Sequence, residues 1–144
     1  MKLVQPKPPK FDNHTFELIF ETQHDPKLVW EWLNTPETFT DTQIFPYKVE
    51  FYSPDPSIDN GFNKGVLNVH YGPLINFAGV LTEIRPYEYR DLQYYYGTYA
   101  INIRWIRPYR LEFWLEETDN GGTIIKMKLS SWVRPWAAKL WKFF

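Results

Sequence analysis

Three histidines are the only side chains of this sequence that ordinarily titrate near neutral pH. His14 begins a predicted strand and His24 directly precedes a predicted helix, so we expect both at the surface. In the predicted strand that contains His70, apolar residues alternate with it and are expected to face inward, so His70 faces outward. If that strand were inverted, Asn68 and His70 would enter the interior. Three scattered histidines without any cysteine do not predict a metal centre. His70 is therefore a candidate polar contact for a ligand only if its strand is inverted.

Arg104 is the second candidate polar residue, because a guanidinium binds carboxylate or phosphate through two parallel hydrogen bonds. Strand alternation turns it outward if Ile103 and Trp105 point inward. Glu83 and Asp91 are strand residues that become acid–base candidates only if they are buried. The sequence has no Gly-rich phosphate loop, no GxSxG elbow and no carboxylate pair at a useful spacing. No catalytic residue can therefore be assigned.

Length and charge limit the classes of function. The chain has 144 residues, no cysteine and a formal net charge of -1, from 17 Asp and Glu against 16 Lys and Arg. This length fits one domain with its own core, and the charge balance gives nucleic-acid binding no general support. We expect neither thiolate metal sites nor a cofactor. The Pro- and Lys-rich residues 1–12 predict a flexible arm before a single domain at 13–144. With no apolar run at the N-terminus, we expect a cytoplasmic protein.

The alternation of apolar and polar residues predicts the elements that must hold these side chains. A strand over 14–23 precedes a helix with Asp25 as N-cap and Pro26 in its first turn, and Pro36 separates it from a second short helix. From residue 47 onward the pattern is almost entirely β. The predicted strands cover 47–54, 65–72, 76–86, 89–97, 99–108, 109–118 and 122–132.

The last two predicted strands form a hairpin whose register follows from parity. Apolar residues alternate with Glu and Trp over 111–116 and with Lys over 125–129. Apolar faces match, and Glu opposes Lys, only if the numbers of paired residues sum to an even value. The loop must then have an odd number of residues, such as three within Asp-Asn-Gly-Gly at 119–122, with a Gly in the left-handed conformation.

The closing segment "SSWVRPWAAKLWKFF" (130–144) predicts an amphipathic helix from Pro135. We expect Trp136 and Leu140 to face the sheet as a lid, because an uncovered β-meander would expose a large apolar surface. The basic and aromatic faces also fit a membrane-surface helix or a homodimer contact, with Trp141 and Phe144 outward. About ten residues follow Arg134, which is roughly 15 Å of helix, so the lid would cover only part of a sheet.

This order of elements predicts an α+β fold in which a curved antiparallel sheet grips the closing helix. The stretch "FELIFETQHDPKLVWEWLNTPETFT" resembles the opening of the START/polyketide-cyclase (SRPBCC, helix-grip) superfamily, and "GVLTEIRPYEYRDLQYY" is similar to its strand–Pro–strand corner. The resemblance covers about residues 14 to 144. It implies a seven-stranded sheet around a C-terminal helix, two short helices after the first strand, and a cavity for a hydrophobic molecule between sheet and helix.

The alternation of each strand indicates which residues are expected to line such a cavity. The alternative is that the same residues form a solid core that binds no ligand. The 19% aromatic content suits either one. An inverted strand would exchange its inward residues for their neighbours. The expected lining is Leu67, Val69, Tyr71, Leu92, Tyr94, Tyr96, Tyr99, Ile101, Ile103, Leu111, Phe113, Leu115, Met127 and Leu129, with Trp136 and Leu140 from the lid.

Three functions stay open at this point. The first is binding or transport of a hydrophobic small molecule such as a lipid or a polyketide, without catalysis. The second follows from the resemblance alone and is a cyclase/dehydrase-type enzyme, in which cavity tyrosines with Arg104 or His70 polarise a carbonyl. The third is a membrane-surface or protein-contact module that acts through the C-terminal aromatic residues.

Overall fold

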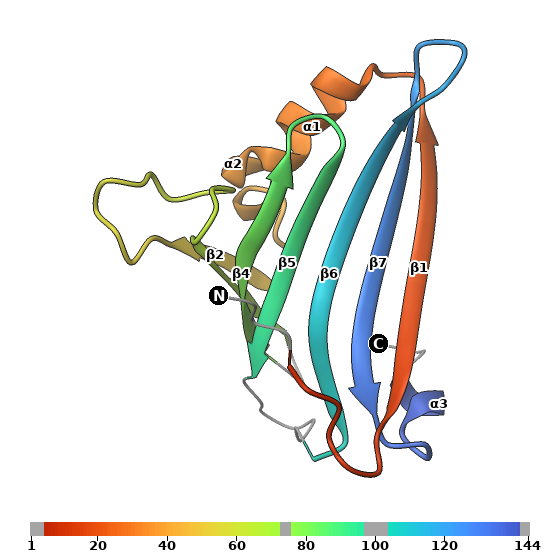
Figure 1. Ribbon diagram of the computed structural model, residues 1–144. Helices are drawn as coiled ribbons and strands as arrows, with labels where there is room; N and C mark the ends of the chain where they lie inside the picture. The colour runs from red at the N-terminus through yellow and green to blue at the C-terminus, as the bar shows by residue number, and fades with distance from the viewer. Residues whose placement is uncertain (1–4, 73–75, 97–103, 142–144) are drawn as a thin grey trace.

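The computed structural model describes residues 5–72, 76–96 and 104–141. Seven antiparallel strands form one curved, unclosed sheet in the order β1-β7-β6-β5-β4-β3-β2, and three helices accompany it (Figure 1). The elements are β1 (Asp12–Thr22), α1 (Pro26–Asn34), α2 (Pro36–Thr40), β2 (Lys48–Tyr52), β3 (Leu67–Tyr71), β4 (Asn76–Arg85), β5 (Tyr89–Tyr96), β6 (Ile106–Glu117), β7 (Thr123–Val133) and α3 (Ala138–Trp141).

The sequence signals around the first two helices are confirmed. An Asp25 side-chain oxygen accepts a hydrogen bond from the Leu28 amide at 3.0 Å, and Pro26 and Pro36 begin α1 and α2. The buried stripe of α1 consists of Val29, Trp30 and Leu33, while Leu28 and Trp32 are exposed. Trp30 therefore lies in the core.

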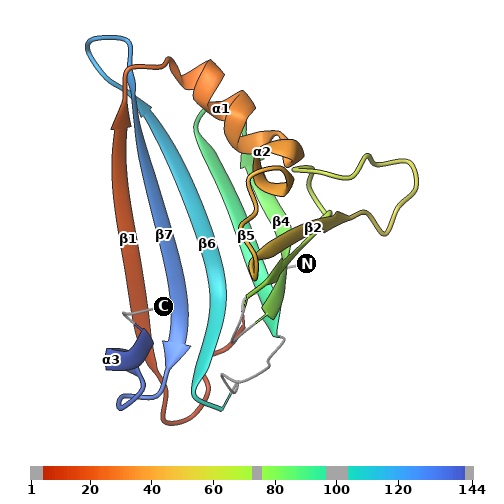
Figure 2. The ribbon, with the colours of Figure 1, turned by 180° about the vertical axis from the view of Figure 1, so that it is seen from behind.

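All three helices pack against the same side of the sheet, which we call the inner face. Val29, Trp30 and Leu33 of α1 contact Leu115 at one end of the sheet. At the other end, Trp141 of α3 and the preceding Ala137 pack against Ile106 and Val133. Figure 2 looks onto this inner side, with α1 and α3 at opposite ends. Between them a third cluster contains Leu81, Leu92 and Tyr94.

The β6–β7 hairpin has the predicted register. Leu111 pairs with Leu129, Leu115 pairs with Ile125, and the numbers of each pair sum to an even value. The Thr118 amide donates to the Gly122 carbonyl at 2.9 Å, which leaves the three loop residues 119–121. Gly121 has φ of 77°, the left-handed conformation that the three-residue loop requires.

Two predicted elements differ in length from the observed ones. The strands expected over 99–108 and 109–118 are in part a single strand, since β6 begins at Ile106 and continues through Pro108. A break in register between Pro108 and Arg110 accommodates the proline, which has no N–H for the ladder. The helix expected from Pro135 is the four-residue α3, so the inner face is covered by several short elements rather than by one long helix.

Candidate ligand-binding face

The inner face carries a group of polar side chains from two strands: Asn68 and His70 on β3, with Arg90 and Tyr94 on β5. Asn68, Arg90 and Tyr94 are buried. Asn68 pairs with Gly79 on β4, and Gly79 pairs with Tyr94. A Cβ at Gly79 would lie 2.8 Å from the Tyr94 ring. Glycine at this position therefore lets the side chains of β5 pack closely over β4.

Arg90 connects the inner face to the end of α1. Its Nη1 donates to the Leu33 carbonyl at 2.6 Å and to the Asn34 side-chain oxygen at 3.1 Å. The guanidinium also lies over the rings of Phe62 and Phe113, at 4.1 and 4.7 Å. A cation is favourable beside the last carbonyls of a helix, and the two rings partly replace its hydration. Burial lowers the pKa of Arg90 to about 10, so it is still charged at neutral pH.

His70 and Tyr94 form an edge-to-face pair with ring centroids 5.6 Å apart. Burial, with a smaller contribution from the Arg90 charge, lowers the pKa of His70 to about 4. Burial also raises the pKa of Tyr94. Both rings are therefore uncharged at neutral pH. They offer hydrogen-bonding groups of the kind that bind a hydroxyl or a carbonyl.

The other half of the inner face is apolar and partly open to solvent. Phe16, Leu18 and Phe20 project from the edge strand β1, and their register with β7 places them on the same side as Met127 and Leu129. Phe16 and Phe20 are exposed although their side chains lie on the side of the sheet that carries the helices. Covering this apolar surface with apolar groups of another molecule is favourable, because it removes the surface from water.

Many residues of the predicted lining lie on the inner face as expected. Their registers link them across β5, β6 and β7, and Tyr94 adds its phenol to the polar group. Whether they contact a ligand stays a prediction. These residues are Leu92, Tyr94, Leu111, Phe113, Leu115, Met127 and Leu129.

The parity expected for β3 is wrong. Leu67, Val69 and Tyr71 lie on the outer face, and Asn68 and His70 lie on the inner face beside Tyr94. Alternation gives the wrong face here, because the polar Asn68 and His70 are the inner residues and the apolar side chains of the strand lie outside. The neighbouring strands decide, because the small Gly79 must lie beneath Tyr94.

The placement expected for the closing segment is also wrong in part. Trp136 and Leu140 are exposed, and Ala137 and Trp141 are the buried residues. The chain turns over 135–137 before α3 begins, which changes the face that a continuous helix would present. Arg104 is exposed in the turn before β6. Tyr99, Ile101 and Ile103 lie outside the described residues, as does the side chain of Tyr96.

The predicted lining omits the inner-face residues Arg90, Phe16 and Phe20, and Asn68 was expected there only if its strand were inverted. Arg90 has the parity of Leu92 and Tyr94, both of which were expected to face inward. That spacing was the available signal, but charged residues in a strand usually point to solvent. The orientation of β3 is the inverse of the expected one, so Asn68 lies on the inner face.

The outer face of the same strands carries a charged network. Arg110 contacts Asp91 at 2.8 Å and Glu112 at 3.1 Å, and both carboxylates are buried. The Tyr89 hydroxyl donates to Glu112 at 2.8 Å, and the Thr82 hydroxyl donates to Asp91 at the same distance. Asp91 is therefore buried, as an acid–base candidate must be, but it is paired with Arg110 on the face away from the helices.

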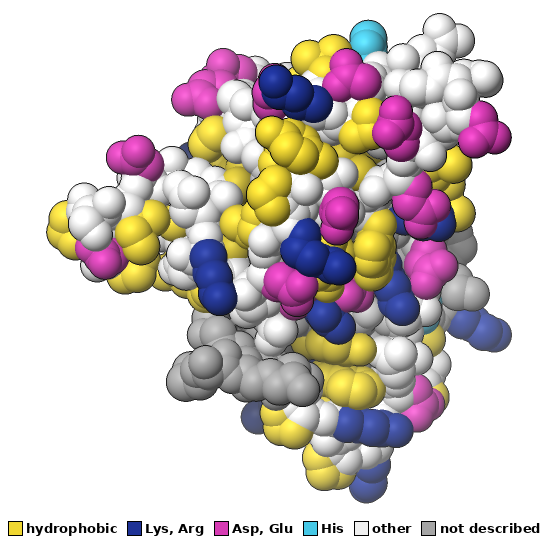
Figure 3. Space-filling view, turned by 45° about the horizontal axis from the view of Figure 1, so that its top comes forward, with side chains coloured by type: hydrophobic (Ala, Val, Ile, Leu, Met, Phe, Trp, Pro, Cys, Tyr) yellow, Lys and Arg dark blue, Asp and Glu magenta, His cyan; other side chains and the backbone are white. Residues whose placement is uncertain are grey.

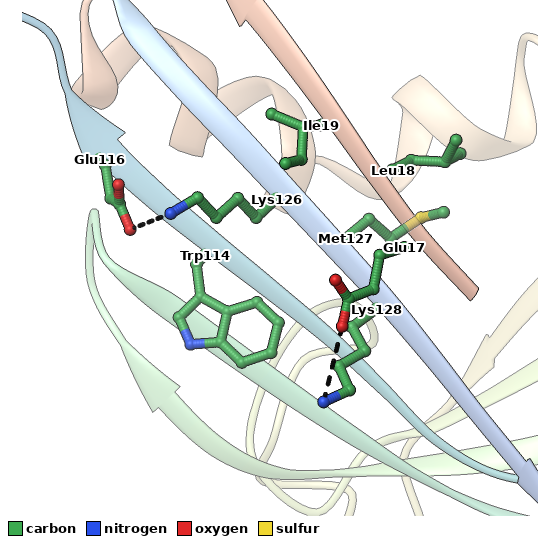
Figure 4. Close-up of a pocket in the computed structure, with 8 residues that line it drawn as sticks. All are labelled: Glu17, Leu18, Ile19, Trp114, Glu116, Lys126, Met127 and Lys128. Carbon is green, nitrogen blue, oxygen red and sulfur yellow. Dashed lines mark hydrogen bonds and ion pairs between the residues drawn. The ribbon is translucent and has the colours of Figure 1, made fainter. Parts of the chain in front are cut away.

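A pocket of about 260 Å³ lies beside this network on the outer side of β1, β7 and β6. Trp114 and Ile19 supply apolar surface there, as Figure 4 shows. Two ion pairs flank them: Lys126 with Glu116 at 2.7 Å, and Lys128 with Glu17 at 3.7 Å. Its charges are paired, so the pocket offers a ligand little polar attraction.

The described part of the chain contains no cluster of three His, Asp or Glu residues that could hold a metal ion. None of its helices has the length and hydropathy to span a bilayer.

No family model and no curated protein matches the sequence. Solved structures do match the fold. Truncated norcoclaurine synthase from Thalictrum flavum matches with a TM-score of 0.67 and 14% identity, covering 92% of this chain and 83% of that chain. The crystal structure of Ara h 8.0201 matches with a TM-score of 0.59 and 15% identity, covering 86% of this chain and 79% of that chain. The solution structure of the Aha1 dimer from Colwellia psychrerythraea matches with a TM-score of 0.53 and 11% identity, covering 80% of this chain and 74% of that chain. The chain therefore has the helix-grip, Bet v 1-like fold.

Proposed function

We propose that the protein binds a hydrophobic small molecule, such as a lipid or a polyketide, on the inner face of the sheet. The observation that carries the proposal is the arrangement of that face. Exposed Phe16 and Phe20 lie at one side, and the polar group around His70 and Tyr94 lies at the other. An apolar surface with a few hydrogen-bonding groups is the usual composition of a small-molecule site. The helix-grip fold supports this class of function in general.

The polar group restricts the polar end of the ligand. His70 and Tyr94 are uncharged at neutral pH, whereas Arg90 is charged and donates to the end of α1. A hydroxyl or carbonyl matches the two neutral groups. The apolar part of the ligand would then lie along β6, β7 and β1, over Phe113 and Met127.

Two neighbouring residues on β1 provide a matched test. Phe20 is 50% exposed and lies on the inner face, whereas Ile19 is 67% exposed and lies on the outer face. We expect Phe20→Ala to weaken the binding of a fluorescent fatty acid by about three- to tenfold. Full burial of an aromatic side chain contributes about 1.5–3 kcal/mol, and a ligand would cover only the exposed half of this one. Ile19→Ala should leave the dissociation constant unchanged.

The same titrations can contradict the proposal. Equal effects of Phe20→Ala and Ile19→Ala would place the ligand elsewhere. Absence of saturable binding across long-chain fatty acids and aromatic polyketides, with no lipid-like mass retained in native mass spectrometry, would remove a hydrophobic ligand altogether.

An enzymatic role is the second candidate, and the pairing of His70 with Tyr94 on the inner face favours it. A buried phenol can donate a hydrogen bond to a carbonyl, and a neutral imidazole can accept a proton. One of the matched norcoclaurine synthase structures is in complex with dopamine and hydroxybenzaldehyde. We therefore suggest incubation with an aromatic amine and an aldehyde, followed by product analysis. A condensation product that disappears in both Tyr94→Phe and His70→Gln would support the enzyme, and equal yields in all three proteins would contradict it.

A further inference from the structure

Three segments meet at the end of the sheet away from α1, at the bottom of Figure 1: residues 5–11, 104–107 and 134–141. We call this region the basic end. The Arg134 amide donates to the Trp105 carbonyl at 2.8 Å, and Arg134 Nε donates to the Arg104 carbonyl at 3.3 Å. The guanidinium groups of Arg107 and Arg134 each lie 4.8 Å from the ring centroid of Phe11, which is buried. These contacts hold the three segments together.

Large apolar side chains project from the basic end. Trp105, Trp136 and Leu140 are all exposed, and the two indole rings lie 5.2 Å apart in an edge arrangement. Their exposure is not the result of a missing core, because Ala137 and Trp141 of the same segment are buried against Ile106 and Val133. Tryptophan is the residue most suited to a boundary between water and lipid, since its ring is apolar and its N–H can be hydrated.

The charge of the basic end has one sign. Its three segments contain six basic residues and no acidic one, although the whole chain has a formal net charge of -1. The adjoining Asp12 lies 3.8 Å from Lys7. Dark-blue and yellow side chains accordingly dominate the lower end of the molecule in Figure 3. The six are Lys7, Lys10, Arg104, Arg107, Arg134 and Lys139.

We propose that the basic end binds the surface of an anionic lipid bilayer, with Trp105, Trp136 and Leu140 in the interfacial layer. Each Lys or Arg near an anionic surface strengthens binding about fivefold, and apolar side chains on the same surface add to this. Pairing of two copies through this end is disfavoured, because a two-fold contact would bring both sets of six positive charges together. The proposal is independent of the ligand on the inner face.

The test uses vesicles of phosphatidylcholine alone and of phosphatidylcholine with phosphatidylserine in equal parts. We expect the protein to co-sediment with the second set only, and added salt to release it. Trp136→Ala combined with Lys139→Gln should weaken the partition coefficient on the order of tenfold, from the loss of one interfacial side chain and one charge.

A matched control lies at the other end of the molecule. Trp32 is 58% exposed and Trp136 is 55% exposed, so Trp32→Ala with Lys27→Gln removes the same two residue types from α1. This control, and Phe20→Ala, should bind vesicles as the unaltered protein does. Equal binding by both double variants, or binding that does not depend on phosphatidylserine, would overturn the proposal. Self-association without vesicles that only Trp136→Ala/Lys139→Gln abolishes would assign the basic end to a dimer instead.

Discussion

Two arginines on neighbouring strands show how differently the two faces of one sheet treat a positive charge. On the outer face, Arg110 is paired with the carboxylates of Asp91 and Glu112, and these interactions raise its pKa. On the inner face, Arg90 contacts a carbonyl, an amide and two aromatic rings. The outer charges form a network that is complete in itself. The inner face keeps neutral polar groups beside apolar surface, which suits it to receive another molecule.

The largest effect should come from breaking the outer network. Asp91→Ala leaves the Thr82 hydroxyl and Arg110 Nε without their acceptor. Removing one partner of a buried ion pair typically costs about 3–5 kcal/mol, and the partial exposure of Arg110 places our expectation near 3 kcal/mol. Urea denaturation measures this loss. Glu83→Ala removes an exposed partner of Arg85 on β4 and should change the unfolding free energy by less than about 0.5 kcal/mol. Similar values for the two variants would contradict a structural role for the network.

The inner face should instead be sensitive to pH. The pKa of His70 is lowered from 6.5 to about 4, so between these values the unfolded chain binds a proton that the folded chain excludes. Folding therefore loses stability as the pH falls through this window, and His70 has no such effect above about pH 7. We expect a loss of about 2–3 kcal/mol between pH 7 and pH 4.5 from this residue.

The measurement compares the pH dependence of unfolding in the original protein and in His70→Gln. His24→Gln, which changes an exposed histidine, is the control. A shallower pH dependence in His70→Gln alone agrees with a buried neutral imidazole, and parallel curves for all three proteins would exclude it.

A smaller effect should follow from replacing Arg90 on the inner face by lysine, which has the same charge and a different shape. Arg90→Lys keeps the charge but loses the planar group that bridges Leu33 and Asn34 and stacks between two rings. We expect destabilisation of about 1–2 kcal/mol, because a lysine is a point charge on a flexible stem. Hydrogen exchange should show the loss as faster opening of the last turn of α1. An unchanged exchange rate there would show that Arg90 does not hold the helix end.

The smallest effect belongs to the outer pocket. Lys126 and Glu116 form an exposed ion pair, and Lys126→Ala should change the unfolding free energy by less than about 0.5 kcal/mol. It should also leave fatty-acid binding unchanged. Weaker fatty-acid binding in this variant would move the candidate site from the inner to the outer face.

Local signals in the sequence were sufficient where one residue decides the conformation. Asp25 and Pro26 define the start of α1, and the parity of β6 and β7 together with Gly121 defines their hairpin. Parity failed in β3, where the polar residues Asn68 and His70 lie on the inner face and the apolar residues lie on the outer face. There the packing of distant residues, such as Tyr94 over Gly79, determines the face.

The sequence predicted only part of the candidate site. Most of its apolar residues lie on long strands with clear alternation, so their face could be assigned. Arg90 could not, because a buried arginine depends on the end of α1 more than fifty residues earlier in the chain. The role of Trp136 could not be assigned either, because the turn at 135–137 interrupts the helical periodicity on which its predicted face depended.

The position of β1 has a consequence for the behaviour of the protein in concentrated solution. An edge strand of eleven residues presents backbone groups that can pair with another chain, and its Phe16, Ile19 and Phe20 make such pairing attractive. Glu17 and Glu21 interrupt this apolar sequence, and their negative charges repel a second copy. Light scattering should therefore show Glu17→Gln/Glu21→Gln aggregating at a protein concentration at which the original chain stays dispersed.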